Sequence, residues 1–255
     1  MADYLVESAL LSQGLGSITE QEMLASWPAS NGRIAWMWKG SIMTGILEEF
    51  CQIRKTGILK ERIHFRNFER AVIERKTGAF TASGTMKACE KLGIPLTVSG
   101  GIGGLNEREG FKSCHDLEAL ICTHTALLAT APKDMFDLTE TVETMKEAGI
   151  QVIGRERDRC DGYLFRQRPA RLSGRWMGER AGEKRLFFQE IPLEKRLADP
   201  DWLRQACEYG TKERKEGREY HPAVNKKLEQ LSGGKSAWLQ FRSLTANLLW
   251  AEEMT

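Results

Sequence analysis

The chain has 255 residues, enough for one large α/β unit with a buried core. Its 37 basic and 35 acidic side chains nearly balance, so the charge makes no case for nucleic acid or a membrane surface as a partner. The six cysteines form no C-x-x-C pair, no apolar run is long enough to span a bilayer, and no secretory leader is visible. We therefore expect a cytoplasmic protein with reduced thiols.

The first half of the chain alternates short apolar segments with amphipathic ones. Residues 4–11 predict a buried strand with Glu7 near its middle, and residues 33–38 and 94–98 predict further strands. Helices are predicted over residues 18–25, 42–53, 67–74 and 83–92. Thr81 or Ser83 would cap the last of these helices, and Gly93 would end it.

The second half continues this alternation. Residues 126–130 and 150–153 predict buried strands, and residues 138–148, 199–215, 222–231 and 237–252 predict helices. Residues 116–121 are too short to assign, and residues 155–183 are basic, glycine-rich and weakly periodic. The pattern as a whole predicts an α/β layered fold, with residues 1–255 forming a single domain.

A glycine-rich turn, Ser99-Gly100-Gly101-Ile102-Gly103-Gly104, follows the strand predicted at residues 94–98. Glycines let backbone N–H groups approach a phosphate closely. The turn does not match the dinucleotide-binding pattern, because the third glycine position counted from Gly101 is Asn106. On the pattern alone, a phosphate loop and an ordinary tight turn both remain open.

Two residues stand out as candidates for catalysis. Lys133 follows a buried strand and Pro132, where loss of hydration would lower the pKa of its amine and allow a Schiff base to form with a carbonyl. A solvated lysine at a helix start is the simpler alternative. Glu7 lies within an apolar strand, where a carboxyl group serves either as a tuned general acid or as a partner for a core donor.

A metal site is the third possibility. Cys114, His115 and Asp116, with Cys122 and His124 nearby, carry metal-ligating side chains, but their spacing fits no standard zinc pattern. Buried thiols and surface histidines explain this cluster more simply.

Taken together, these motifs resemble the pseudouridine-5'-phosphate glycosidase family. The resemblance covers nearly the whole chain and rests on the order of short motifs with small length changes between them. They are residues 7–14 (ESALLSQG), 81–86 (TASGTM), the glycine turn, Asp116-Leu117, Lys133, Gly149-Ile150 and residues 231–234 (LSGG). The resemblance implies a layered α/β/α fold and a homotrimer.

The resemblance also implies roles for individual residues. Lys133 would be the Schiff-base nucleophile that attacks C1 of ring-opened ribose 5-phosphate, and Glu7 would be the proton donor. The positions that would contact the phosphate, sugar or base are Arg62, Thr81, Ala82, Ser99, Cys114, His115, Asp116 and Gln240. A carbon–carbon glycosidic bond has no leaving oxygen or nitrogen to protonate, so an iminium at C1 would supply the electron sink that cleavage requires.

Several positions depart from the family pattern. The family's manganese-binding aspartate corresponds to Lys112, and an ammonium group cannot ligate a divalent cation. The resemblance thus implies Mn²⁺, whereas Lys112 argues against it. A histidine and an arginine after the glycine turn are replaced by Asn106 and Glu107. The catalytic pair matches and the recognition residues differ, which is typical of an enzyme acting on a related substrate.

The sequence therefore predicts a C-glycosidase or lyase that makes or breaks the bond between ribose 5-phosphate and a pyrimidine-like base. Pseudouridine 5'-phosphate or a related C-nucleotide would be the substrate, and the synthetic direction is also open. Two alternatives are a nucleotide or sugar-phosphate binding protein and a Schiff-base lyase or aldolase for another sugar phosphate.

Overall fold

The computed structural model describes residues 3–107 and 110–255. The strands are β1 (Leu5–Glu7), β2 (Arg33–Trp38), β3 (Ser41–Gly45), β4 (Glu61–Ile63), β5 (Gly78–Phe80), β6 (Leu96–Val98), β7 (Ala126–Ala129), β8 (Gln151–Gly154), β9 (Arg159–Cys160), β10 (Ala170–Arg171), β11 (Gly174–Arg175) and β12 (Arg185–Phe188). The α-helices are α1 (Glu20–Ser26), α2 (Leu47–Lys55), α3 (Phe68–Ile73), α4 (Ala82–Leu92), α5 (His115–Cys122), α6 (Leu138–Glu147), α7 (Pro200–Lys215), α8 (Tyr220–Leu231) and α9 (Lys235–Met254).

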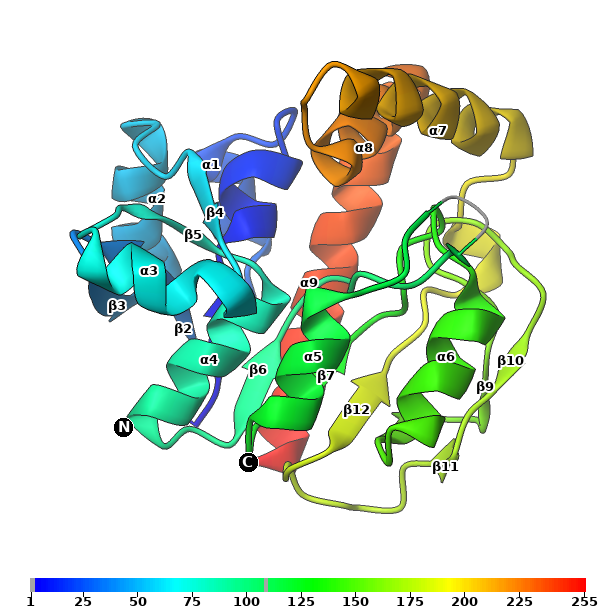
Figure 1. Cartoon of the computed structure of the whole chain (residues 1–255), viewed down its shortest axis with the longest axis horizontal. Helices are drawn as coiled ribbons and strands as arrows, with labels where there is room; N and C mark the ends of the chain where they lie inside the picture. The colour runs from blue at the N-terminus through cyan, green and yellow to red at the C-terminus, as the bar shows by residue number, and fades with distance from the viewer. Residues whose placement is uncertain (1–2, 108–109) are drawn as a thin grey trace.

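One large sheet organises the described residues. Its strands run in the order β11-β8-β12-β7-β6-β1-β2-β5-β4, with β3 paired to β2 at one side. The strands from β11 to β2 are parallel to their neighbours, and β2 is antiparallel to β5 and to β3. Helices α4, α5 and α6 cover one face, and α9 crosses behind the other (Figure 1). The predicted α/β/α layering is confirmed.

Alternate side chains of each strand explain why both faces carry helices. Leu127, Leu186 and Phe188 belong to the apolar core beneath α4, α5 and α6. Their neighbours Leu128 and Phe187 belong to the core on the α9 side. Successive side chains of a strand point to opposite faces, so central strands that are apolar throughout require cover on both.

The predicted strand at residues 4–11 is wrong in its extent. Strand β1 ends at Glu7, and a π-helical segment, Leu10–Gly14, follows it. An apolar run does not distinguish a buried strand from a buried helical turn, so the sequence placed the boundary too late. Glu7 therefore lies at the carboxyl end of β1 rather than near its middle. Its side chain lies at the edge of the sheet, next to the loops that follow the strands.

The predicted helix over residues 42–53 is also wrong in its first third. Residues Ser41–Gly45 form β3, which pairs with β2 in an antiparallel hairpin, and α2 begins only at Leu47. The turn residues Lys39 and Gly40 both have positive φ, at 48° and 83°, which suits a two-residue hairpin turn. The unassigned residues 116–121 lie within α5, and the region 155–183 contains the short strands β9, β10 and β11.

Candidate active site

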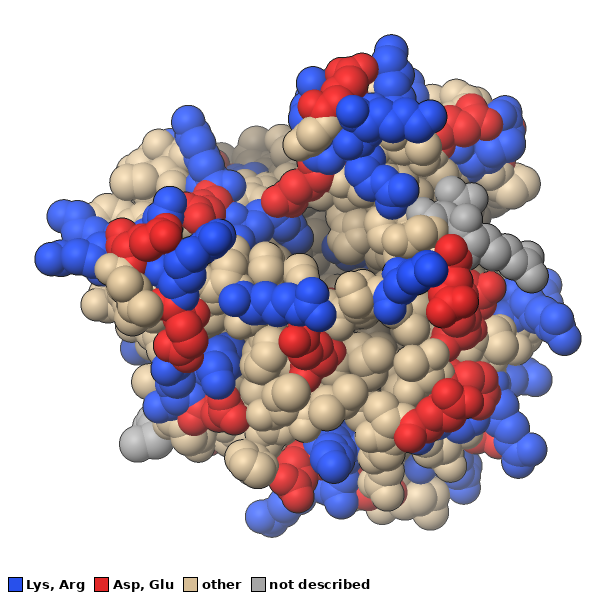
Figure 2. Space-filling view, viewed as in Figure 1, with Lys and Arg blue, Asp and Glu red and all other residues tan. Residues whose placement is uncertain are grey.

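A cavity of about 480 Å³ lies where the carboxyl ends of the central strands meet the α7–α8 hairpin. Figure 2 shows this face hollowed beneath the hairpin, with basic side chains around the hollow. The walls come from the end of β1, from β4, from the starts of α4 and α5, from the loop after β7 and from the roof formed by α7 and α8. Ligands of open α/β sheets bind at this edge of the sheet.

Most of the sequence-predicted site residues line this cavity. They are Glu7, Arg62, Thr81, Ala82, Cys114, His115, Asp116 and Lys133. Among the described residues, the structure does not bring Ser99 or Gln240 to the cavity wall. Gln240 is buried in α9, and its backbone carbonyl accepts a hydrogen bond from Ser243. Lys112, the position of the family's metal ligand, is exposed.

Glu7 is held by the glycine turn. Its Oε1 accepts hydrogen bonds from Ser99 Oγ at 2.8 Å and from the Gly100 N–H at 3.3 Å. Burial raises the pKa of Glu7, while nearby Lys133 and the two hydrogen bonds oppose this rise. Only 6% of Glu7 is exposed. A carboxyl group in this state can hold a proton at higher pH than an ordinary glutamate, which is the property a general acid needs.

Lys133 is held by the other end of the same turn. Its N–H donates to the carbonyl of Ile102 at 3.0 Å, and Ile102 forms a parallel bridge with Pro132. Burial lowers the pKa of the Lys133 ammonium, with Arg62 acting in the same direction and Glu7 opposing. An amine that loses its proton more easily is a better nucleophile toward a carbonyl carbon.

The glycine turn binds protein groups through several of its N–H donors. The Ile102 N–H donates to the Ala131 carbonyl at 3.1 Å, and the Gly103 N–H donates to Asp116 Oδ2 at 2.8 Å. The other oxygen of Asp116 accepts from the Ser83 N–H at 2.9 Å. The turn thus positions Glu7 and Asp116, and the donors that serve them are unavailable to a phosphate. This geometry favours the tight-turn reading over the phosphate-loop reading.

Arg62 faces the cavity from β4. Its Nε lies 3.3 Å from Glu219 Oε2 in the α7–α8 roof, and its Nη1 donates to Gln13 Oε1 at 3.3 Å. Because the Glu219 side chain is 63% exposed, an anionic ligand could displace it from Arg62 at little cost. Thr81 caps α4 nearby, and its hydroxyl lies 3.1 Å from that of Ser83. A cation beside a helix start suits a phosphate group.

Two cavity residues that the sequence did not single out are His64 and His221. The His64 ring stacks on the His115 ring with centroids 3.9 Å apart. Burial lowers the pKa of His64 to about 4 and that of His221 to about 3, and the positive charge of Arg62 adds to both shifts. Both imidazoles are therefore neutral at physiological pH. Each is a lone histidine in no motif, so no sequence signal marked them.

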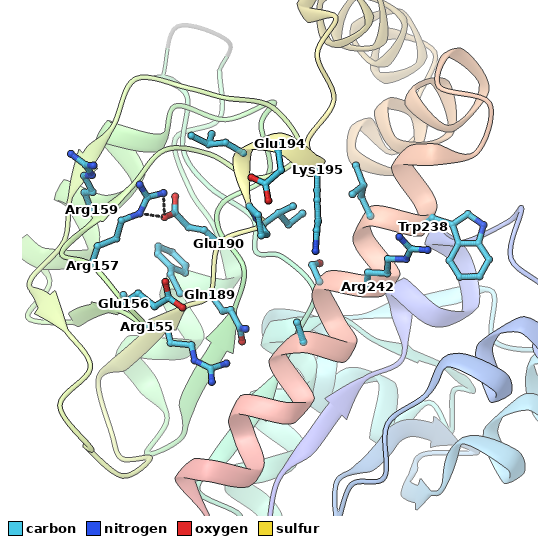
Figure 3. A pocket seen from close by; sticks show the side chains of 18 of the residues that line it. Arg155, Glu156, Arg157, Arg159, Gln189, Glu190, Glu194, Lys195, Trp238 and Arg242 are labelled. Carbon is cyan, nitrogen blue, oxygen red and sulfur yellow. Dashed lines mark hydrogen bonds and ion pairs between the residues drawn. The ribbon is translucent and has the colours of Figure 1, made fainter.

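A larger cavity, of about 1050 Å³, lies between the end of β12, the segment after β8 and the start of α9 (Figure 3). Among the described residues lining it, none belongs to the predicted catalytic set. Arg157 in its wall is paired with Glu190, and Arg155 is paired with Glu253 at 2.7 Å. The chemistry therefore assigns the site to the smaller cavity.

Comparisons with known proteins identify the family of the chain. The family model for indigoidine synthase A like proteins matches residues 22–181, more than half of the chain. The chain belongs to this family. The predicted resemblance to pseudouridine-5'-phosphate glycosidases is confirmed. These relatives are enzymes.

Two curated proteins to which the chain is similar are named pseudouridine-5'-phosphate glycosidases. The one from Geobacillus kaustophilus is 27% identical over 69% of the chain and 64% of its own length. The one from Thermus thermophilus is 24% identical over 95% of the chain and 92% of its own length.

Two solved structures share the fold at 20% sequence identity. An indigoidine synthase A-like protein from Thermotoga maritima has a TM-score of 0.77 and covers 98% of the chain and 91% of its own. The prealnumycin C-glycosynthase AlnA, solved with ribulose 5-phosphate, has a TM-score of 0.74 and covers 98% and 89%.

The Mn²⁺ that the resemblance implies does not fit the residues present. Lys112 offers an ammonium group without a lone pair, and both oxygens of Asp116 accept backbone hydrogen bonds. Within residues 3–107 and 110–255, no group of three His, Cys, Asp or Glu side chains is arranged to hold a metal ion. Cys122 is exposed, and His124 pairs with Glu183 at 2.7 Å.

Among the residues that the structure describes, no helix has both the length and the apolar character needed to cross a bilayer.

Proposed function

We propose that this protein makes or breaks the carbon–carbon bond between C1 of ribose 5-phosphate and a pyrimidine-like base. The observation that carries the proposal is that Glu7 and Lys133 line one cavity and perturb each other's pKa. Burial favours a protonated carboxyl at Glu7 and a neutral amine at Lys133. This is the combination of states that iminium chemistry requires.

In the synthetic direction, the Lys133 amine adds to the C1 aldehyde of open-chain ribose 5-phosphate. Glu7 gives a proton to the departing hydroxyl, water leaves, and an iminium remains on Lys133. The nucleophilic carbon of the base then attacks C1 and loses its proton. The C4 hydroxyl closes the ring and expels the lysine amine. The sugar phosphate and the base thus give the C-nucleotide and water, and the reverse sequence describes cleavage.

The rest of the cavity supports recognition of a phosphorylated sugar and an uncharged base. Arg62 and the start of α4 at Thr81 and Ala82 would bind the phosphate. The neutral imidazoles of His64 and His221 each offer one donor and one acceptor to the edge of an uncharged heterocycle. The substrate contacts of Cys114, His115, Asp116, Ser99 and Gln240, like the homotrimer and the cytoplasmic location, remain predictions.

Borohydride trapping with ribose 5-phosphate tests the proposal. Iminium formation loses water and reduction adds two hydrogens, so the reduced adduct should add the mass of the sugar phosphate less one oxygen atom to the intact protein. Peptide mapping should place it on Lys133. Lys133→Met should lose the adduct, whereas Lys112→Met, which removes an exposed lysine from the same face, should keep it. An adduct that survives in Lys133→Met would contradict the assignment of the nucleophile.

Glu7→Gln tests the acid. The amide oxygen still accepts from Ser99 and Gly100, so the change removes the proton and leaves the scaffold in place. We expect the rate of C-nucleotide formation or cleavage to fall about 100-fold or more, the usual contribution of a positioned acid. Glu48→Gln, an exposed change on α2, is the control. A rate within about threefold of the wild type would remove Glu7 from the mechanism.

A further inference from the structure

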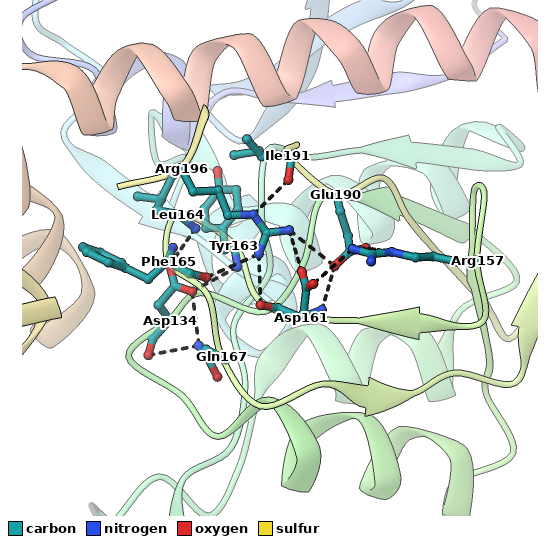
Figure 4. A network of polar contacts seen from close by, with 10 residues as sticks. All are labelled: Asp134, Arg157, Asp161, Tyr163, Leu164, Phe165, Gln167, Glu190, Ile191 and Arg196. Atoms are coloured by element: carbon teal, nitrogen blue, oxygen red, sulfur yellow. Dashed lines mark hydrogen bonds and ion pairs between the residues drawn. The ribbon is translucent and has the colours of Figure 1, made fainter. Parts of the chain in front are cut away.

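The loop at residues 161–167 is fixed by the residue that follows Lys133. Asp134 Oδ1 accepts from the Tyr163 N–H at 3.0 Å and from Gln167 Nε2 at 3.1 Å. Its Oδ2 accepts from the Leu164 N–H at 2.7 Å and from the Phe165 N–H at 3.3 Å. Figure 4 shows these groups converging on the carboxylate. One partly buried carboxylate thus holds three consecutive backbone amides.

Tyr163 carries this loop to the glycine turn. Its side chain is 1% exposed, and a Cβ placed on Gly101 would lie 3.0 Å from the ring. The ring therefore packs directly against the backbone of the turn, which only glycine permits at this distance. The Tyr163 hydroxyl lies 3.2 Å from Ser243 Oγ. The preceding residue of the turn, Gly100, donates its N–H to Glu7.

Arg196 forms hydrogen bonds with the far side of the loop. This buried side chain donates to the carbonyls of Asp161 at 2.9 Å and of Phe165 at 3.4 Å. It also lies 2.8 Å from Asp161 Oδ1 and 3.4 Å from Glu190 Oε1 (Figure 4). Both ends of the loop are thus tied by charged hydrogen bonds, which resist displacement better than neutral ones.

A carboxylate in this position is costly. Burial raises the pKa of Asp134 to about 6, even though four donors favour the charged form. The groups that favour the charged form are the hydrogen bonds from Tyr163, Leu164, Phe165 and Gln167. If Asp134 had only a structural role, apolar side chains would stabilise this region equally well. Groups that store such a cost concentrate at functional sites.

We propose that residues 161–167 form a brace that fixes both catalytic groups, with Asp134 as its positioning residue. The brace is linked to the Lys133 backbone through the adjacent residue Asp134. It is linked to Glu7 through Tyr163, which packs against the Gly100-Gly101 backbone that holds the Glu7 carboxyl group. It therefore sets the position of the amine relative to the carboxyl. Its importance for the reaction rests on the function proposed above, whereas its mechanical role does not.

Hydrogen exchange tests the mechanical role. Asp134→Asn keeps the size of the side chain but turns one acceptor into a donor that faces backbone N–H groups. The control is Asp137→Ala, which removes the cap of α6 and costs about 1 kcal/mol without touching the brace. Asp134→Asn should speed amide exchange in peptides covering residues 161–167 and 99–104, and Asp137→Ala should not.

Loss of protection confined to residues 161–167 would overturn the brace, because the glycine turn would then be independent of it. Should Asp134→Asn fail to fold, Gln167→Ala removes a single donor to Asp134 and must show the same two-segment pattern more weakly. Unchanged exchange at residues 99–104 in Gln167→Ala, with faster exchange at 161–167, would count equally against it.

Trapping kinetics test the chemical role. At saturating ribose 5-phosphate, Asp134→Asn should slow formation of the borohydride adduct about tenfold or more, because small misplacements of reacting groups are costly. The Kd for ribose 5-phosphate should stay within about threefold. Tyr163→Phe keeps the ring and should stay near wild type, whereas Tyr163→Ala should follow Asp134→Asn.

Equal trapping rates for Asp134→Asn and Asp137→Ala would show that the brace does not serve the reaction. If the wild-type protein formed no adduct, the proposed function would fail instead. The exchange comparison would then decide the brace by itself.

Discussion

Ser99 acts on Glu7 without lining the cavity. Its Oγ lies within hydrogen-bond distance of two acceptors, Glu7 Oε1 at 2.8 Å and the Gly101 carbonyl oxygen at 2.9 Å. The hydrogen bond to Glu7 lowers the pKa of the carboxyl and so partly offsets the effect of burial. A residue predicted to hold phosphate is thus placed to tune the acid.

Ser99→Ala should move the pH dependence of the reaction in a defined direction. Without the hydroxyl, the pKa of Glu7 rises further, so the carboxyl keeps its proton to higher pH. The alkaline limb of the rate profile should shift to higher pH, with smaller changes on the acidic side. A profile of adduct formation between pH 5 and 10 measures this shift, and a downward shift would contradict it.

The meeting of Glu7 and Lys133 in one cavity was predictable from sequence, and the presence of the two histidines there was not. Glu7 and Lys133 stand in apolar segments within an ordered series of motifs, so their residue types are conspicuous. His64 follows a three-residue strand, and His221 lies one residue before the predicted start of its helix. Their convergence depends on the α7–α8 roof folding over β4, a long-range arrangement that leaves no periodic pattern.

Helix α9 joins two neighbouring strands behind the site. Asn247 Nδ2 donates to the carbonyl of Ser99 at 2.8 Å and to Thr130 Oγ1 at 3.1 Å, just beyond the ends of β6 and β7. The side chain is fully buried. One amide on the helix therefore fixes the ends of both strands that lead into the cavity.

Asn247→Leu should destabilise the protein by about 2–3 kcal/mol, because it leaves the Ser99 carbonyl and the Thr130 hydroxyl buried without their donor. Urea unfolding measures the change, and Leu249→Ala, at an exposed position of the same helix, is the control. A loss below about 0.5 kcal/mol would mean that water or another group replaces the amide.

The long helices and central strands were predictable because their apolar patterns are strong. The β2–β3 hairpin was missed because Lys39-Gly40 is a weaker turn signal than Asn-Gly, and the strand after it runs into the pattern of α2. Strands β4 and β5 have three residues each, too few to show alternation. Residues 155–183 carry little regular structure, and no pattern in them indicated that Tyr163 packs against the glycine turn.

Buried neutral histidines make the stability of the whole molecule depend on pH. The pKa values of His64 and His221, about 4 and about 3, lie below the ordinary value of about 6.5. Between these values the unfolded chain binds more protons than the folded one. Stability therefore falls as pH falls below about 6.5.

His221→Phe should reduce this loss. Each histidine contributes about 1–2 kcal/mol to the difference between pH 7 and pH 5. Asp134, with its raised pKa, acts in the opposite sense, so the measurement is the difference between variant and wild type in urea unfolding at both pH values. His124→Asn, at an exposed histidine, is the control. Equal pH dependence in His221→Phe and the wild type would mean that His221 titrates normally.

The position of Glu7 and Lys133 in the sheet has a consequence for substrate range. Glu7 ends β1, Lys133 follows β7, and β6 alone lies between these strands. Neighbouring strands are about 4.8 Å apart, so the backbone hydrogen bonds of the sheet set the ends of β1 and β7 about 10 Å apart. Loops and the α7–α8 roof can diverge without altering this spacing. Mutational drift in the roof is therefore free to reshape the cavity while the strands that lead to Glu7 and Lys133 keep their spacing.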